Sequence, residues 1–382
     1  MSKSNEIQTP AYICEEALLE KNLQLLEHVQ KESGAKIILA LKGFAMWSTF
    51  DLVAKYLKGC TASGLYEAKL AYEEFNKHNP HAEIHTYSLA FKEEEIEEIA
   101  KISDHIVFNS LNQFQSFGSK VKEINPDIEI SLRINPEVSS SPVDLYNPCG
   151  LYSRLGTTLQ NFDKTIIKEL DGLNFHALCE QNVDALEKVL EAFEEKFSKY
   201  FKDLKYINFG GGHHITKKGY DVERLIEIIK KFRKKYGVEV YLEPGEAVGW
   251  ECGYLMATVL DIFHNGMDIA ILDTSAEAHM PDTLSMPYRA EVRGAGEAGV
   301  KPYTYRLGGN TCLAGDIMGD YSFDEPLKVG DKIIFEDQIH YTFVKNTTFN
   351  GVKLPSLVIR RENGEFELIK EFGYGDYKSR LS

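Results

Sequence analysis

The chain has 382 residues, of which 43% are hydrophobic and 26% charged, and its formal net charge is −15. This composition is that of an ordinary globular protein and excludes a largely disordered chain, while the length favours one large domain joined to a second. The negative charge repels phosphate backbones, which excludes a nucleic-acid partner; it either attracts a cationic substrate or only keeps the protein soluble.

At the N-terminus, the first ten residues lack the basic and apolar regions of an export signal. No later run reaches the roughly 20 apolar residues that a membrane span needs. The cysteines lie far apart and form no CxxC pair; they are Cys14, Cys60, Cys149, Cys179, Cys252 and Cys312. We therefore expect reduced thiols in a cytoplasmic protein, with no membrane partner and no bound metal.

Between residues 35 and 245, short apolar or β-branched runs alternate with helical segments. The predicted strands are residues 36–42, 60–64, 83–89, 105–110, 129–136, 173–178, 206–212 and 239–245. Amphipathic stretches separate them, for example residues 91–102 and 183–200, whose apolar side chains share one face. Eight such alternations predict a parallel (β/α)8 barrel, in which the chemistry gathers at the C-terminal ends of the strands.

After residue 250 the pattern changes to strand-like runs with little helical period. These runs are residues 254–263, 332–335, 340–345 and 357–360. Residues 9–14 form a further predicted strand that could pair with this C-terminal sheet. We predict an α/β fold with a barrel of residues 15–250 and a β-domain made of residues 1–14 and 251–382.

Lys42 ends the first predicted strand of the barrel. An ammonium group is costly to bury after six residues of buried-strand character unless it has a chemical role. A barrel mouth partly shielded from water would lower the pKa of Lys42, as a lysine that forms a Schiff base requires. The alternative is a lysine that extends its charge into water at a strand end.

Two further strand ends carry candidate groups. Gly210, Gly211 and Gly212 follow the seventh strand and can present backbone N–H groups to a phosphate, although a tight turn alone would also explain them. Glu243 ends the eighth strand, and Gly245 just beyond it permits close approach of a ligand. Glu243 could hold the proton of a pyridine nitrogen or form a salt bridge within the barrel.

Other candidates are more ambiguous. His176, near the end of the sixth strand, could stack on an aromatic cofactor or be a buried structural histidine. Arg133, in the fifth strand, could reach a phosphate or neutralise carboxylates. Residues 308–316 have turn-forming composition around Cys312 and Asp316, as in loops that face a site, although Cys312 could also be an inert buried thiol.

Together these motifs resemble one enzyme family over nearly the whole chain. The matching segments, in order, are Ala40-Leu-Lys42, Ala62-Ser-Gly64 with Glu67, Phe175-His176, Gly210-Gly-Gly212, Glu243-Pro-Gly245, Thr311-Cys312, and Tyr341-Thr followed by Thr348-Phe-Asn-Gly351. The chain is similar to the fold-type III, or alanine-racemase-like, pyridoxal 5'-phosphate (PLP) enzymes. Within them it resembles the ornithine and diaminopimelate decarboxylase group.

The resemblance implies PLP as the cofactor and assigns roles to the candidate residues. Lys42 would form the Schiff base, His176 would stack on the ring, and Glu243 would pair with the ring nitrogen. The residues predicted to contact the cofactor are Lys42, Ser63, Arg133, His176, Gly210, Gly211, Gly212, Glu243, Gly245 and Tyr341. The family also implies a homodimer with shared active sites, in which Cys312 and Asp316 come from the partner subunit. The Cys312 thiol would act catalytically near the carbon that is protonated.

One residue departs from the family pattern and indicates the substrate. Members that act on diaminopimelate or ornithine carry an arginine after Glu-Pro-Gly, whereas this chain has Glu246. A carboxylate suits a substrate whose distal half is an amine. We predict Glu246 and Asp282 as the amine contacts, with Asp273, Glu277 and Asp316 as further substrate-side acids. Together with this departure, the resemblance implies decarboxylation of a carboxylated polyamine in bacterial polyamine biosynthesis.

Three alternatives stay open. The first is decarboxylation of diaminopimelate or ornithine. The second is an amino-acid racemase, which would bring a tyrosine base to the place where this chain has Cys312. The third is a non-catalytic relative that has lost the cofactor, although such proteins usually lose the lysine or the phosphate loop, and this chain keeps Lys42 and its glycine triplet.

Overall fold

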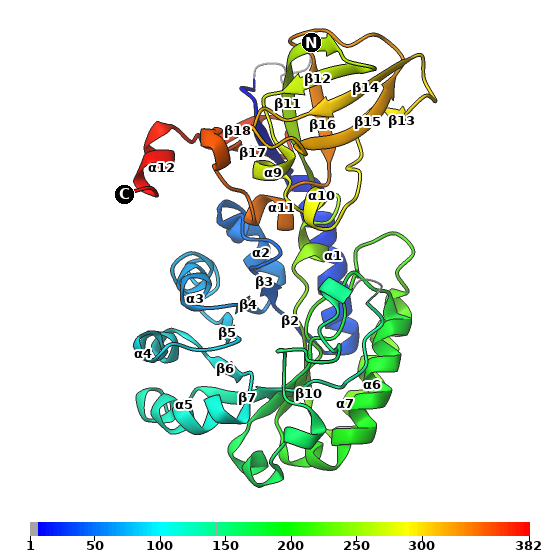
Figure 1. Ribbon diagram of the computed structural model, residues 1–382. Helices are drawn as coiled ribbons and strands as arrows, with labels where there is room; N and C mark the ends of the chain where they lie inside the picture. Colours follow the sequence, from blue (N-terminus) through cyan, green and yellow to red (C-terminus); the bar gives the residue numbers. More distant parts are fainter. Residues whose placement is uncertain (1–6, 142–143) are drawn as a thin grey trace. The chain divides into compact units, whose positions relative to one another are not determined.

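The computed structural model describes residues 7–141 and 144–382 (Figure 1). The chain forms two compact units, one of Lys21–Val248 and the other of Met1–Glu20 together with Gly249–Ser382. The division predicted from the sequence placed the boundaries after residues 14 and 250. We call the first unit the barrel and the second the β-domain.

The barrel is built on one parallel sheet. Its strands are β2 (Lys36–Ile37), β3 (Leu39–Ala40), β4 (Gly59–Ala62), β5 (Glu83–Tyr87), β6 (His105–Phe108), β7 (Glu129–Arg133), β8 (Gly172–Asn174), β9 (Tyr206–Asn208) and β10 (Glu239–Leu242). β2 and β3 are consecutive segments of one run; β2 pairs with β10, and β3 pairs with β4. This run therefore joins the two edges of the sheet, which closes it and confirms the predicted (β/α)8 barrel.

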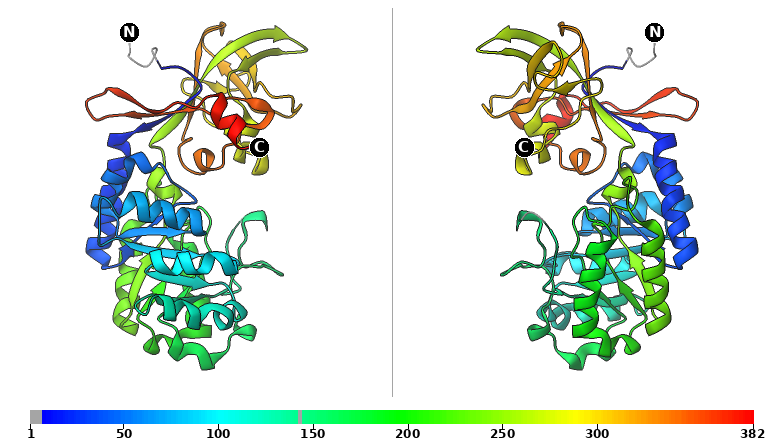
Figure 2. Two further views of the ribbon diagram at one scale, coloured as in Figure 1. Left: turned by 90° about the vertical axis from the view of Figure 1, so that its left-hand side faces the viewer. Right: turned by 90° about the vertical axis from the view of Figure 1, so that its right-hand side faces the viewer.

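Helices cover the outer side of the barrel sheet (Figures 1 and 2). They are α1 (Glu16–Ser33), which begins in the β-domain unit, α2 (Phe50–Tyr56), α3 (Leu65–Leu70), α4 (Glu93–Ile102), α5 (Leu111–Ile124), α6 (Val183–Phe197) and α7 (Val222–Tyr236). The predicted helical stretches 91–102 and 183–200 correspond to α4 and to α6 with the short turn η7 (Ser198–Asp203). In α6 the apolar face packs inward, with Leu186, Val189 and Phe193 fully buried.

One crossover departs from the regular alternation. Between β7 and β8 the described residues form only the 3-10 turns η4 (Asp144–Tyr146), η5 (Leu159–Asn161) and η6 (Lys164–Glu169). Residues 134–163 are rich in Pro, Gly, Ser and Asn, which either break helices or offer the backbone competing hydrogen bonds. This composition explains why the described residues of this crossover form no regular helix.

The β-domain contains a mixed sheet. Its strands are β1 (Ala11–Glu15), β11 (Gly253–His264), β12 (Asp268–Leu272), β13 (Gly296–Glu297), β14 (Tyr303–Gly308), β15 (Ile317–Phe323), β16 (Lys332–Glu336), β17 (Ser356–Arg360) and β18 (Phe366–Lys370). β1 pairs antiparallel with β11 and parallel with β17. Ile13 in β1 is buried with Met256 and Val358 from these neighbours. The N-terminal strand therefore joins the C-terminal sheet, as predicted.

One predicted strand is wrong. Residues 340–345 were expected to be extended, but Tyr341–Val344 forms the short helix α11. Tyr, Thr, Phe and Val favour strands mainly because they pack well on a half-buried sheet surface. In the described part of the chain no strand pairs with this segment. Without a neighbouring strand, the strand preference of these residues does not produce a strand.

The remaining short helices join these elements. They are η2 (Trp47–Thr49), η3 (Ala71–Phe75), α8 (Glu246–Gly249), α9 (Ala276–His279), α10 (Asp282–Ser285), η8 (Phe349–Gly351) and α12 (Tyr374–Ser379). None of the described helices combines the length and the apolar character that crossing a bilayer requires.

Candidate active site

The predicted barrel residues share one edge of the sheet. Lys42 follows β3, Arg133 ends β7, His176 follows β8, and Glu243 follows β10 directly. Gly210–Gly212 follow β9 in the same way. Because all strands of the barrel are parallel, their C-terminal ends meet at one mouth, and these side chains come together there.

Lys42 lies in a setting suited to a nucleophilic amine. Solvent can reach its side chain, but protein atoms crowd around the ammonium group on most sides. This loss of water lowers the pKa of Lys42, the positive charge of Arg133 lowers it further, and the negative charge of Glu243 opposes both. A larger fraction of Lys42 is therefore neutral and nucleophilic at a given pH than of an ordinary lysine.

Two glycines let the chain segments at Lys42 and Glu243 approach closely. A Cβ on Gly43 would lie 2.8 Å from the backbone nitrogen of Glu246. A Cβ on Gly245 would lie 2.8 Å from the carbonyl oxygen of Ala40. Both distances are shorter than real Cβ contacts, so the turn after β3 can pack on the turn after β10 only because neither residue has a side chain.

His176 is held in one neutral form. The backbone N–H of Gly211 donates to His176 Nδ1 at 3.1 Å, so this nitrogen carries no proton. Burial lowers the pKa of His176 well below its usual value, and the charges of Lys42 and Arg133 lower it further. The imidazole is therefore neutral with its proton on Nε2. Arg133 donates to the carbonyl oxygen of His176 at 3.1 Å and lies over the ring of Tyr87, 4.8 Å from its centroid.

The glycine triplet occupies space that no side chain could share. Gly210 and Gly212 have φ angles of 69° and 83°, which L-residues rarely adopt. A Cβ on Gly210 would lie 2.3 Å from the carbonyl oxygen of Phe175. Gly210 and Gly211 donate their N–H groups to side chains of the barrel. Among the described residues, the N–H of Gly212 has no acceptor, which leaves it for an anion.

Glu243 is a buried carboxylate with one oxygen engaged. The residue is 8% exposed, and Oε1 accepts a hydrogen bond of 2.7 Å from Asn208 Nδ2. Within the described residues, no Lys or Arg forms an ion pair with it, and Oε2 has no hydrogen-bond partner. A buried carboxylate without a bound cation favours a ligand that brings a positive or proton-bearing group.

In the β-domain, Asp316 organises the loop that carries Cys312. One oxygen of Asp316 accepts from the backbone of Ala276 at 2.7 Å, and the other from the hydroxyls of Ser275 at 2.9 Å and Thr311 at 2.6 Å. The exposed Cys312 donates its backbone N–H to Asn350 at 2.6 Å. Asp316 is therefore engaged on both oxygens, and it fixes a loop whose thiol faces outward.

The other predicted acids lie in different settings. Both oxygens of Asp282 accept from Lys345 Nζ, at 2.7 and 3.0 Å. Asp273 accepts from the Thr258 backbone at 2.7 Å and from a threonine hydroxyl of the N-terminal segment at 2.6 Å. Glu277 is partly exposed beside Asp316. Of the five predicted substrate-side acids, Glu246 alone belongs to the same unit as Lys42.

Ser63 and Tyr341 were also predicted to contact the cofactor. Ser63 is exposed directly after β4, where its backbone N–H donates to Glu67 at 2.6 Å. Tyr341 begins α11 in the β-domain and is partly exposed. The contacts of Ser63 and Tyr341 neither support nor oppose their predicted roles, which stay predictions.

Sequence reasoning missed Asn208, which donates to Glu243. It is the last residue of β9 and was treated as part of an apolar run. The signal was present in the sequence: an amide side chain inside a buried strand is costly unless both of its ends are hydrogen-bonded. The position of Asn208 in such a strand could therefore have predicted a specific polar partner.

A second polar cluster lies at the opposite ends of the strands. Glu83, His85 and His105 offer ligand atoms within 4.8 Å of one another. The two imidazole rings stack with centroids 3.8 Å apart and planes only 16° apart. Lone pairs in nearly parallel ring planes do not converge on a single ion, and Glu83 already binds Lys36 at 2.7 Å. This cluster is better explained by polar packing inside the barrel than by a metal site.

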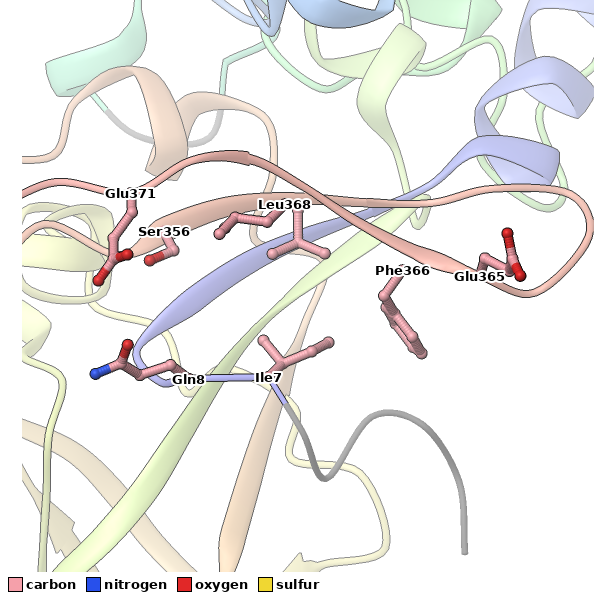
Figure 3. Close-up of a pocket in the computed structure, with 8 residues that line it drawn as sticks. Ile7, Gln8, Ser356, Glu365, Phe366, Leu368 and Glu371 are labelled. Carbon is pink, nitrogen blue, oxygen red and sulfur yellow. The ribbon is translucent and has the colours of Figure 1, made fainter.

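The β-domain also has a surface hollow of about 470 Å³ (Figure 3). It is lined by Ile7, Gln8, Ser356, Val358, Glu365, Phe366, Leu368 and Glu371. In Figure 3 its two glutamates lie at opposite ends of the hollow, and Glu371 is paired with Lys353 at 2.8 Å. Its lining residues include neither a lysine nor a cysteine nor a glycine loop, so we locate the chemistry at the barrel mouth.

Comparison with known proteins is consistent with this arrangement. A sequence model of the family described as "Pyridoxal-dependent decarboxylase, C-terminal sheet domain" matches residues 12–338. The chain is 56% identical to the carboxynorspermidine/carboxyspermidine decarboxylase of Campylobacter jejuni, covering 98% of this chain and 99% of that protein. It is 43% identical to the carboxyaminopropylagmatine decarboxylase of Synechocystis sp., covering 99% and 96%.

A solved structure has the same fold throughout. The crystal structure of carboxynorspermidine decarboxylase from Campylobacter jejuni, complexed with norspermidine, superposes with a TM-score of 0.91 at 55% identity. The match covers 98% of this chain and all of the other.

The buried histidine that follows the glycine triplet gives a pH prediction. Burial lowers the pKa of His213 to about 4, whereas an unfolded histidine titrates near 6.5. Between these values the unfolded state binds more protons, so the free energy of unfolding should fall as the pH drops from about 6.5 and stop falling near pH 4. For a shift of this size the loss is on the order of 3 kcal/mol.

Urea unfolding of wild type and His213→Gln between pH 7 and pH 4 measures this contribution. The wild type should lose more stability than the variant over that interval, because glutamine does not titrate. Parallel pH profiles for the two proteins would contradict a neutral, buried His213.

Proposed function

The chain belongs to the pyridoxal-dependent decarboxylase family, and from this premise we propose that it removes CO2 from carboxynorspermidine and carboxyspermidine to give norspermidine and spermidine. The observation that carries the proposal is the barrel mouth, where Lys42, with its lowered pKa, shares one edge with the buried carboxylate of Glu243. Identity of 56% over nearly the full length to a decarboxylase of these two substrates supports the substrate class.

The residues at the mouth fit pyridoxal phosphate. The N–H of Gly212 is open to a phosphate, and the loop around it leaves no space for side chains at the three glycines. Oε2 of Glu243 is open to a ring nitrogen, and the neutral His176 ring is flat and fixed by Gly211. Lys42 supplies the amine that would hold the cofactor covalently. We propose the same cofactor-binding role for Ser63, Arg133, Gly245 and Tyr341.

When bound, the cofactor supplies a ring that accepts the electron pair left by the departing CO2. Glu243 would hold the protonated ring nitrogen, and the neutral N–H that Asn208 donates to one of its oxygens leaves the other oxygen available for this contact. His176, uncharged, would lie against the ring without adding a positive charge to it. After the loss of CO2, we propose that the Cys312 thiol delivers the proton to the substrate carbon.

Glu246 is the strongest candidate for binding a distal amine. Its side chain is only 14% exposed, and Oε2 lies 3.9 Å from His214 Nε2. It stands three residues after Glu243, on the turn that packs against the Lys42 segment. A charge-assisted hydrogen bond from an ammonium group to a carboxylate so shielded is stronger than one in open water.

We keep Asp282 and Glu277 as further amine contacts. Asp282 already binds a primary ammonium group, that of Lys345, so a substrate amine could replace it without leaving the carboxylate unpaired. Asp316 and Asp273 differ because their oxygens accept hydrogen bonds that build the β-domain. For these two we propose that they shape the substrate side of the site.

We also propose a homodimer that works in the cytoplasm. Asp316 and Asn350 hold the Cys312 loop so that its thiol faces outward, as a group delivered to a partner's active site must. All six cysteines are free in the structure, which is typical of a reducing compartment.

Replacing Lys42 tests the cofactor site. Lys42→Ala should abolish the visible absorbance of the lysine-bound cofactor and lower turnover by about three orders of magnitude or more, because no other amine replaces it there. Lys42→Arg is the matched control: it keeps the positive charge, yet a guanidinium group does not deprotonate, so it should fail equally. Full absorbance and turnover in either variant would make Lys42 an ordinary strand-end lysine.

Replacing Glu246 tests substrate recognition. Glu246→Gln removes the charge at constant shape, so kcat/KM for carboxynorspermidine should fall by about 10- to 100-fold, as expected for one lost charge-assisted hydrogen bond. The cofactor absorbance should not change. Glu227→Gln, which removes an exposed carboxylate of α7 that is 67% accessible, is the control. If both variants kept wild-type kcat/KM, Glu246 would not contact the substrate.

Mixing two inactive variants tests the shared site. Lys42→Ala and Cys312→Ala should each have little activity alone. If Cys312 acts across the dimer, random exchange of subunits makes one intact site in each mixed dimer, and an equal mixture should recover about a quarter of wild-type activity. A mixture no more active than the sum of its parts would show that Cys312 does not serve the partner's site.

A further inference from the structure

Asn208 lies inside the barrel, one strand away from Glu243. It is the last residue of β9, fully buried, and its neighbours Ile207 and Phe209 are buried apolar residues. β9 pairs with β10 so that Asn208 lies opposite Tyr241, two residues before Glu243. A primary amide in such a place is destabilising by a few kcal/mol unless both its donor and its acceptor are satisfied.

Both ends of the amide are satisfied by parts of the candidate active site. Nδ2 donates to Glu243 Oε1 at 2.7 Å, and Oδ1 accepts from the Gly210 N–H at 2.8 Å. These partners also fix which way the amide points, because a carboxylate only accepts and a backbone N–H only donates. The opposite orientation would set oxygen against oxygen and N–H against N–H.

The hydrogen bonds form a closed circuit. Asn208 bonds to Glu243 and to Gly210 through its side chain, and the backbone N–H of Glu243 donates to the Gly210 carbonyl at 2.8 Å. Gly210 has the positive φ that turns the loop toward Gly212. A displacement of Asn208 therefore moves both the carboxylate and the start of the glycine loop.

We propose that Asn208 is a positioning residue, which holds the ring-nitrogen contact of Glu243 and the phosphate contact of the glycine loop at the spacing of one pyridoxal phosphate molecule. This inference rests on the proposed function. The ring nitrogen and the phosphate belong to one rigid ligand, so the two protein contacts bind it well only if their separation is fixed in advance.

The neutrality of Asn208 matters as much as its geometry. A lysine or arginine at this place would form an ion pair with Glu243 and compete with the ring nitrogen for the carboxylate. An amide satisfies one oxygen with a neutral N–H and leaves Oε2 for the ligand. Asn208 thus holds Glu243 in place without putting a cation beside it.

Asn208→Asp separates the two hydrogen bonds at nearly constant shape. It keeps an acceptor for Gly210 but puts a second carboxylate against Glu243, and like charges at this distance cannot both stay ionised easily. Its affinities for pyridoxal phosphate and for pyridoxal, which lacks the phosphate, should both fall by about 10- to 100-fold. Asn208→Leu loses both bonds and should bind pyridoxal phosphate more weakly still.

The experiment titrates full-length protein, stripped of cofactor, with pyridoxal phosphate and with pyridoxal, and follows the visible absorbance of the bound form across pH. Asn363→Asp is the control for the change from amide to carboxylate: Asn363 is exposed in the turn between β17 and β18 of the β-domain. Its affinities should change by less than about 3-fold.

A double variant shows whether Asn208 acts through Glu243. In a Glu243→Gln background, adding Asn208→Asp should cost far less affinity than it does in wild type, because the partner charge has already gone. Equal losses in both backgrounds, or wild-type affinity in Asn208→Asp, would overturn the proposal. If Asn208→Asp did not fold, Asn208→Ser, judged in the same two backgrounds, would decide it.

The outcomes keep this inference apart from the proposed function. A wild-type protein that binds no pyridoxal phosphate would refute the proposed function itself. The positioning role alone would be refuted by a different result: wild type binds the cofactor and releases CO2, and the Asn208 variants bind the cofactor with the same affinity.

Discussion

A parallel barrel closes only when its first and last strands pair, and in this protein that closure runs through the segment that carries Lys42. Residues 36–37 pair with the last strand and residues 39–40 with the second, so one short run completes the sheet. The same run delivers Lys42 to the mouth, where Gly43 and Gly245 let it approach the turn after β10. Closing the barrel and assembling the site are therefore one structural event.

Within that mouth, neutral hydrogen bonds arrange charged groups. Gly211 fixes His176 as an uncharged ring, and Asn208 fixes Glu243 without pairing it with a cation. Arg133 and the loss of water both shift Lys42 toward its neutral form. Lys42, His176 and Glu243 are thus each left with an atom that a ligand can bind. Leaving such groups without a full set of protein partners destabilises the fold, and it is typical of a functional site.

Periodicity and strand-end position made the barrel predictable. The eight apolar runs overlap the observed strands because burial on both faces of a parallel sheet leaves a local signal. The predicted strands extend beyond the observed strands at their C-terminal ends. The last predicted residues, such as those around Glu243, leave the sheet and line the mouth of the barrel. The helix at Tyr341–Val344 was missed because strand preference depends on a neighbouring strand that is absent there among the described residues.

By itself the sequence determined the barrel, the β-domain with its N-terminal strand, and the placing of Lys42, the glycine triplet and Glu243 at strand ends, because these follow from spacing along the chain. Only the tertiary structure decided the partners of each polar group: Asn208 with Glu243, Asp282 with Lys345, and Asp316 with the start of α9. Such pairs join residues far apart in sequence, and a hydrogen bond forms only where the packed backbone brings donor and acceptor within about 3 Å.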